Sequence, residues 1–322
     1  MAHRELDWYL VQARRISEHR EIGFERDCRK LYRGMMKDLQ QFVSDTYVQY
    51  AEDDRLTFAM LQKYGYEARF LEEIEQRIIK TTFQEREMLH QLVNDTYSLA
   101  YKGMVDGVLN SAPDALDAAF AGSVAMTPEQ IKNVVQNPVM DLALSRNHSA
   151  IVYDIKQAVA VGMMNGDRYT TVARRIAELL DSDKGAYKKA IRIARTETHR
   201  VREAGNHDAA MYVDTELQKG TTGMRMTKKW LSMKDERVRP QKLKKTKKGW
   251  VKTMGKGPDH MKMHGQIVLE DELFDLLDGN STMMPGSSGV AGHDINCRCT
   301  VRRELMTEAE YYAKTGKHFP KR

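Results

Sequence analysis

The C-terminal part of the chain holds side chains that can ligate a metal. Cys297 and Cys299 lie in the segment INCRCTV, and His264 and His293 precede them. Two thiolates and an imidazole form a ligand set that Zn²⁺ accepts. Cys-x-Cys is far less specific than a pair of Cys-x-x-Cys motifs, however, and a free cysteine beside Ile295 also packs as a small hydrophobe. Both interpretations stay open at this point, and we expect a reduced pair that packs without metal.

A carboxylate interrupts an apolar stripe in the segment 190–212, AIRIARTETHRVREAGNHDAAMY, which has the periodicity of one long helix. The members of the stripe are Ile193, Glu197, Val201 and Ala204. A carboxylate buried alone is costly, so Glu197 needs an arginine, a histidine or backbone donors from elsewhere in the chain. The alternative is a glutamate at the edge of the stripe that reaches water.

We predict that Glu197 is buried and paired with Arg298, since a planar guanidinium can hold a buried carboxylate by two hydrogen bonds. Arg237 is the second choice, and Arg239 is a further candidate. Such a pair would dock the last strand onto the long helix. The apolar side chains expected around it are Trp230 and Phe274.

The same residue types would also serve a metal-dependent nuclease, which we keep as the alternative function. It would use Glu197, Asp235, His264 and the two cysteines. The sequence contains no H-E-x-x-H motif, no phosphate-cradling glycine loop and no nucleophile elbow. A regulator that reads DNA bases would need a recognition helix, and no segment offers one. We therefore expect a protein without catalytic activity.

The length and the amino-acid composition are those of an ordinary globular protein. With 322 residues and 41% hydrophobic residues, the chain is long enough for two domains with real cores. The first residues have no apolar segment typical of a signal peptide, and no apolar run approaches the roughly 20 residues of a membrane span. Three cysteines do not make a disulfide framework, so we expect synthesis in the cytoplasm.

Positive charge is concentrated in one segment. Residues 225–262 contain 14 Lys or Arg against three acidic residues, an excess of +11, so the rest of a chain with net charge +6 carries −5. A dense basic segment on a mildly acidic body suggests a contact with a polyanion. We expect residues 234–265 to form a long exposed loop, and its part Lys242–Lys256 to be mobile and to contact DNA. The predicted DNA-contacting residues are Lys242, Lys244, Lys245, Lys247, Lys248 and Lys252.

The elements that must position these residues are mainly helices. Residues 1–110 contain no proline, and apolar residues recur at steps of three and four, which predicts long amphipathic helices. Aromatic residues expected in their core are Trp8, Tyr9, Phe42, Tyr47, Phe58, Phe70 and Tyr97. A domain boundary is expected near 112–126.

The middle of the chain predicts helices in series. Thr127 and Pro128 begin one helix, Asn137-Pro138 ends it, a second runs to Asn165-Gly166, and a third begins near Thr170. Further on, short elements predict a small unit. We expect strands at MRMTKKWLSM, QIV and INCRCTV, and short helices at LEDELFDLL and TEAEYYAKTG. The predicted fold is mainly α, with a long N-terminal helical region, a helical segment and a small C-terminal α+β unit with a few short strands.

An ordered set of residues links the long helix to the C-terminal unit. The set is Ala194–Glu197, Trp230, Asp235, Arg237, Val238, Arg239, His264, Gly265, Phe274, Pro285 and Asn296–Cys299. Its order resembles the phage head morphogenesis domain of phage Mu protein F and related minor head proteins, from about Thr127 to Arg303. The resemblance implies a structural core constellation of Glu197, Trp230, Asp235, Arg237, Arg239, His264, Cys297, Arg298 and Cys299. The chain departs from the family in its long Lys-rich segment before His264.

The resemblance implies a minor head protein of a tailed phage, associated with the portal and acting in head assembly and in DNA packaging or ejection. It implies three partners: the portal protein, head shell proteins and packaged double-stranded DNA bound without sequence preference. We expect no cofactor, and no membrane contact while the protein is in the head. The protein would occupy the host cytoplasm during assembly, and then the virion, in the capsid interior or at the portal vertex. The domains would be 1–126 (N-terminal helical region), 127–303 (head morphogenesis domain) and 304–322 (tail).

Overall fold

The computed structural model describes most of the chain. The described residues are 6–111, 137–182, 185–219, 223–233, 241–246, 249–254 and 258–320, with 241–246 and 249–254 described by their backbone alone. The chain divides into two compact units. Unit 1 comprises Met1–His19, Val93–Gln136 and Arg195–Arg322, and unit 2 comprises Arg20–Leu92 and Asn137–Ala194. The predicted boundary at 126/127 falls outside the described residues, so the predicted domains stay predictions.

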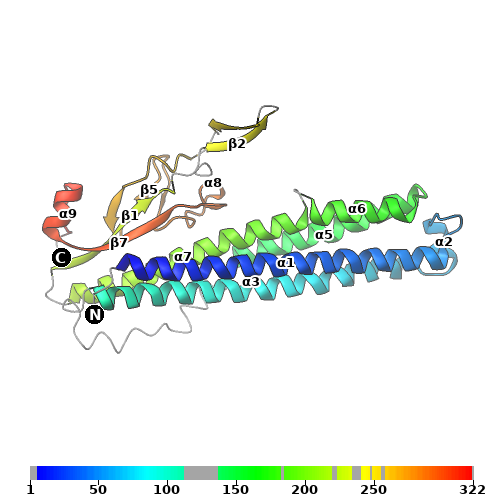
Figure 1. Ribbon diagram of the computed structural model, residues 1–322, viewed down its shortest axis with the longest axis horizontal. Coiled ribbons are helices and arrows are strands. Elements are labelled where there is room, and N and C mark those ends of the chain that lie inside the picture. Colours follow the sequence, from blue (N-terminus) through cyan, green and yellow to red (C-terminus); the bar gives the residue numbers. More distant parts are fainter. Residues whose placement is uncertain are drawn as a thin grey trace. The chain divides into compact units, whose positions relative to one another are not determined.

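Long helices dominate the N-terminal region, as predicted (Figure 1). Helices α1 (Leu6–Tyr50) and α3 (Glu67–Ser111) have 45 residues each, and the short α2 (Phe58–Lys63) lies between them in the chain. Tyr47, Phe70 and Tyr97 are buried, which confirms them as core residues. Trp8 is 39% exposed, so its assignment to the core is wrong. A tryptophan near the start of a helix has fewer neighbours to cover its large ring.

Unit 2 adds three helical segments to parts of α1 and α3. These are α5 (Pro138–Met164), α6 (Tyr169–Asp181) and the start of α7 (Ala186–Lys219). Asn137 caps α5 by accepting a hydrogen bond from the backbone N of Val139, and Gly166 with φ +61° follows its end. The predicted second and third helices are therefore confirmed. The predicted helix at Thr127 lies outside the described residues.

The C-terminal part of unit 1 contains a three-stranded antiparallel sheet. Its order is β4 (Ile267–Leu269), β1 (Met224–Leu231) and β7 (Thr300–Thr307). The short strands β5 (Phe274–Asp275) and β6 (Ser281–Thr282) pair separately, and α8 (Ala291–Asp294) precedes β7. Helix α9 (Glu308–Thr315) begins with a capping box formed by Thr307 and Glu310. The predictions of strands at MRMTKKWLSM and QIV, and of a C-terminal helix, are confirmed.

Two predicted elements of this part are wrong. The segment LEDELFDLL forms turns and β5 rather than a helix, because Asp275 accepts a hydrogen bond from the backbone N of Leu277, and Leu277 has φ +61°. The segment INCRC precedes its strand instead of belonging to it. Asn296 has φ +54°, which breaks the extended backbone, and β7 begins only at Thr300.

The predicted long loop in the basic segment is wrong at residues 241–246 and 249–254, whereas residues 258–265 form turns without a helix or strand, as predicted. Strands β2 (Gln241–Thr246) and β3 (Gly249–Met254) pair with each other as an antiparallel two-stranded sheet. Pairing satisfies backbone donors and acceptors that a loop would leave to water, and residues such as Thr246 and Val251 favour strands. Lys247 and Lys248 lie outside the described residues.

Candidate functional site

One face of α7 carries polar side chains that contact the C-terminal sheet. Glu203, His207 and Asp214 are all buried, and the steps of four and seven residues place them on the same side of the helix. Thr300 Oγ1 donates to Glu203 Oε1 at 2.8 Å, and His207 Nδ1 lies 2.7 Å from Glu270 Oε1. Specific hydrogen bonds therefore dock helix α7 onto the sheet.

Glu270 is the centre of a buried ionic cluster. Arg303 Nε and Nη2 both lie 3.1 Å from Glu270 Oε1, and the two side chains are fully buried. Burial alone would raise the pKa of Glu270, but Arg303, together with His207 and Lys228, holds it below its usual value. Glu270 is thus a carboxylate in the folded protein, and it joins α7, β4 and β7.

Lys228 belongs to the same cluster and is fully buried. Its Nζ donates to the backbone oxygens of Glu270 and Met283, at 2.8 and 2.9 Å. Burial lowers the pKa of Lys228 to about 8, although Glu270 opposes this shift.

A second buried ion pair holds the end of α7 against β1. Arg225 Nε and Nη2 donate to the carboxylate of Asp214 at 2.8 to 3.1 Å, and the backbone N of Met226 donates to Asp214 Oδ1 at 2.7 Å. A guanidinium fork and a backbone donor satisfy one carboxylate from two directions. This pair holds Asp214 of α7 beside the first residues of β1.

The apolar core of the sheet includes both C-terminal cysteines. The buried cluster consists of Trp230, Met263, Val268, Phe274, Leu276, Cys297, Cys299 and Val301. Trp230 and Phe274 meet edge to face, with ring centroids 5.2 Å apart. Cys297 and Cys299 are both buried and form no disulfide with each other in the structure.

His260 brings an imidazole to the two thiols. His260 Nδ1 lies 3.7 Å from Cys297 Sγ and 3.4 Å from Cys299 Sγ, and all three residues are buried. Hydrogen bonds from Cys297, and then from His260 and Ser232, outweigh burial and lower the pKa of Cys299 to about 5. The described ligand atoms of His260, Cys297 and Cys299 all lie within 4.8 Å of one another, a spacing that suits a metal ion.

The other two predicted metal candidates have different positions. His293 stacks on His260, and its Nδ1 lies 3.2 Å from His260 Nε2, so it contacts the histidine rather than the thiols. His264 Nδ1 accepts a hydrogen bond from the backbone N of Ser232. Next to His264, Gly265 with φ +94° donates its backbone N–H to Trp230 O at 2.8 Å.

Glu197 is 6% exposed, as its apolar stripe predicts. Its Oε2 accepts a hydrogen bond from Arg200 Nε at 2.9 Å, one turn further along α7. Pairing between Glu197 and Arg298 stays a prediction. The other residues of this prediction lie outside the described residues. They are the candidate partners Arg237 and Arg239, and Asp235 of the same motif.

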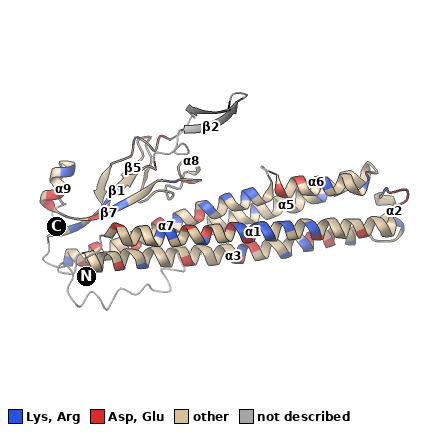
Figure 2. Ribbon diagram, in the orientation of Figure 1, with Lys and Arg blue, Asp and Glu red and all other residues tan. Residues whose placement is uncertain are grey.

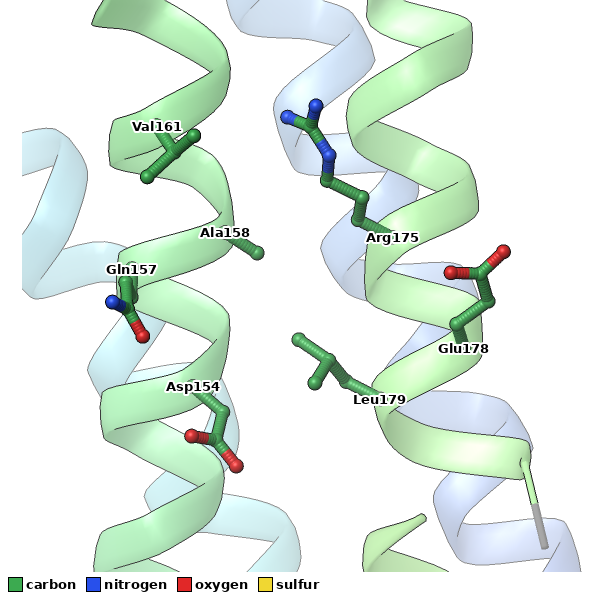
Figure 3. A pocket seen from close by; sticks show the side chains of 7 residues that line it. All are labelled: Asp154, Gln157, Ala158, Val161, Arg175, Glu178 and Leu179. Atoms are coloured by element: carbon green, nitrogen blue, oxygen red, sulfur yellow. The ribbon is translucent and has the colours of Figure 1, made fainter. Parts of the chain in front are cut away.

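A surface pocket of about 330 Å³ lies between α5 and α6 in unit 2 (Figure 3). Asp154 and Gln157 come from α5, and Glu178 and Leu179 come from α6. Its arginine, Arg175, is held by Asp167 at 2.6 Å. The described lining contains no cysteine, serine or histidine for nucleophilic chemistry.

Figure 2 shows basic and acidic residues interspersed along the described helices.

A known protein family matches the part of the chain that contains the elements just described. The family model described as "Phage Mu protein F like protein" matches residues 153–302, from α5 into β7. Residues 153–302 are thus similar to the phage Mu protein F-like family. The Mu F-like segment thus contains Glu197, Glu270, the Asp214–Arg225 pair, the apolar cluster and the cysteines, and it ends one residue before Arg303. The predicted resemblance to this family is confirmed.

Relatives extend the similarity beyond the Mu F-like segment. The minor head protein GP7 of Bacillus phage SPP1 is 25% identical over 303 residues, which cover 92% of this chain and 85% of the relative. The NAD(+)–arginine ADP-ribosyltransferase EFV of Enterococcus faecalis is 28% identical over 176 residues, 53% of this chain but 30% of that protein. No solved structure matches the chain. None of these findings supports the nuclease alternative.

Sequence reasoning missed His260, Glu270, Arg303 and the pair Asp214–Arg225. His260 stands in a Lys- and Gly-rich segment that predicts a loop, and Glu270 stands in an acidic run that is typical of a surface. The partners of His260 and Glu270 lie far away in the sequence, so the spacing of residues does not reveal these contacts. Asp214 alone could have been noticed, because it is an acidic residue on the apolar face of the long helix.

Proposed function

We propose that this chain is a minor head protein of a tailed phage, present in few copies and bound at the portal vertex. It assembles in the host cytoplasm, contacts the portal protein and head shell proteins, and remains in the virion. There it serves head assembly and the packaging or ejection of DNA. The family match of residues 153–302 supports a role in phage head morphogenesis.

One observation carries this proposal. The similarity to a phage minor head protein extends over 92% of this chain, and so includes the long N-terminal helices as well as the Mu F-like segment. Two proteins that share only a binding module would match over that module alone. Shared architecture over nearly the whole chain favours a shared place in the particle.

The helices offer surface for such partners. At 1.5 Å per residue, helices of 45 residues are about 68 Å long. In unit 2, a groove between α3 and α5 is lined partly by apolar side chains, and two of them, Ile79 and Tyr153, are 44% and 65% exposed. Exposed apolar side chains beside a groove are typical of protein interfaces. We propose that this groove contacts the portal protein.

The basic segment supplies the contact with packaged DNA. Its lysines at 242, 244, 245, 247, 248 and 252 can neutralise phosphates without reading sequence. Within this segment, residues 241–246 and 249–254 form the paired strands β2 and β3 rather than the loop that the sequence predicts.

We further propose that the chain is not an enzyme. The ADP-ribosyltransferase match covers less than a third of that protein, so its activity does not transfer with the similarity. Incubation of the purified chain with labelled NAD⁺ and an arginine-rich protein should transfer no label. Transfer of label above a heat-treated control would overturn this part of the proposal.

The function is tested on particles of the phage that encodes the chain. Mass spectrometry of purified heads should find the chain at a small fraction of the major capsid protein. Deletion of its gene should yield heads that fail to package or to deliver DNA. Absence of the chain from DNA-filled heads, or normal infectivity after deletion, would contradict the proposal.

A further inference from the structure

We infer that His260, Cys297 and Cys299 bind a zinc ion in the core of the C-terminal unit. The sequence favoured metal-free packing of the cysteines, because Cys-x-Cys is an unspecific motif and apolar residues lie beside it. The histidines that it offered as ligands were His264 and His293. The structure brings a different histidine to both thiols. The site is independent of the proposed function, since any protein with this fold could use it for stability.

The distances between the ligand atoms fit tetrahedral coordination. Zn–S bonds of about 2.3 Å and Zn–N bonds of about 2.0–2.1 Å at tetrahedral angles place sulfur and nitrogen about 3.6 Å apart. In the structure, His260 Nδ1 lies 3.7 Å from Cys297 Sγ and 3.4 Å from Cys299 Sγ. A single ion can therefore reach all three atoms with little movement of the side chains.

A chain of hydrogen bonds determines which ring nitrogen of His260 is unprotonated. His293 Nε2 lies 2.8 Å from the acceptor Asp278 Oδ2, so His293 carries its proton there and leaves Nδ1 free to accept. His293 Nδ1 lies 3.2 Å from His260 Nε2, which therefore donates. The tautomer of His260 that remains has an unprotonated Nδ1 facing the two sulfurs. Carboxylate-to-histidine chains of this kind commonly orient zinc ligands.

The burial of the three residues favours a bound ion that neutralises their charge. His260 is 2% exposed and Cys299 is 1% exposed, among apolar side chains that include Trp230. Two thiolates, one neutral imidazole and one Zn²⁺ have no net charge, whereas a lone thiolate or imidazolium would be an uncompensated charge in the core. The chemistry of the ligand set thus matches its surroundings. Among the described residues, three protein ligands meet here, and the fourth position of a tetrahedral ion is open to a further ligand.

The ion would also cross-link two segments that lack a long strand or helix. His260 lies in turns that follow β3, and the cysteines lie between α8 and β7. Metal bonds between such segments stabilise a fold in the way that structural zinc sites do. Loss of the ion would therefore loosen this part of unit 1.

The test uses the full-length chain, purified without chelator. Elemental analysis of this protein should find about one zinc per chain. Exchange of the zinc for Co²⁺ should then give the thiolate-to-metal absorption and the intense visible bands of tetrahedral cobalt. Removal of the metal should lower the melting temperature, and added zinc should restore it.

Variants separate this site from surface binding. Cys299→Ser and His260→Ala should abolish stoichiometric zinc and the cobalt spectrum, while His264→Gln and Cys28→Ser should retain both. Asp278→Asn, which alters the orienting chain and leaves the three ligands in place, should weaken zinc binding by about 10- to 100-fold. A native protein with neither zinc nor a cobalt spectrum overturns the inference. Zinc that persists in a folded Cys297→Ser/Cys299→Ser variant overturns it as well.

Discussion

Arg303 and Glu270 form a fully buried ion pair, with Arg303 Nη2 3.1 Å from Glu270 Oε1. The pair joins β7 to the end of β4, and His207 on α7 completes the carboxylate's shell at 2.7 Å. One carboxylate therefore ties the long helix to two parts of the sheet. This is the role that the sequence assigned to Glu197 and Arg298.

Replacement of Glu270 by glutamine should lower the free energy of unfolding by about 3–5 kcal/mol, because it strands the buried guanidinium of Arg303. Chemical denaturation of the native chain and the variant measures the difference. The matched control is Glu308→Gln, which removes an exposed ion pair with His318 and should cost less than about 1 kcal/mol. Equal effects of the two substitutions would show that the cluster is not a stabilising centre.

Stability should depend on pH through Lys228. Its folded pKa of about 8 lies below the usual lysine value of 10.5, so the unfolded chain binds more protons between these values. The contribution of Lys228 to stability is least favourable below about pH 8 and improves as the pH rises toward 10.5. Relative to Lys228→Met, the native chain should gain about 1.4 kcal/mol per pH unit within that window. A difference that stays constant across this pH window would contradict the depressed pKa.

Glu197→Ala should cost roughly 3–5 kcal/mol if its charge is held by a buried arginine. Double-mutant cycles of Glu197→Gln with Arg298→Met and with Arg200→Met identify that arginine. The sequence-based prediction is a coupling energy above about 1 kcal/mol with Arg298. Coupling confined to Arg200, which the structure places 2.9 Å away on the same helix, would refute the Arg298 pairing.

The helices were predictable because their apolar residues repeat every three to four positions over long, proline-free stretches. The hairpin of β2 and β3 was not, since the many lysines in a short segment obscure the alternation that marks strands. Glu197 could be placed in the core from its stripe. The partners of Glu270 could not, because His207 and Arg303 lie 63 and 33 residues away in sequence, and only the folded sheet brings them together.

The basic segment should bind duplex DNA weakly, without sequence preference and with a steep dependence on salt. Neutralising Lys244, Lys245, Lys247 and Lys248 should reduce the slope of log K against log salt by about 0.9 for each phosphate that the variant no longer neutralises. Fluorescence anisotropy at several salt concentrations measures the slope. A control variant removes the same charge from exposed lysines of the helices. These are Lys37, Lys80, Lys102 and Lys188. If the hairpin variant and the control behave alike, the segment does not bind the DNA.

The most direct test of the proposed function is binding to the portal protein encoded by the same phage. After co-expression, the full-length chain should elute with portal rings in size-exclusion chromatography. Tyr153→Glu, in the groove of α3 and α5, should weaken this association without changing the melting temperature. Tyr312→Glu, which alters a 50% exposed tyrosine of α9, should leave it intact. Elution of the native chain apart from intact portal rings would contradict a place at the portal vertex.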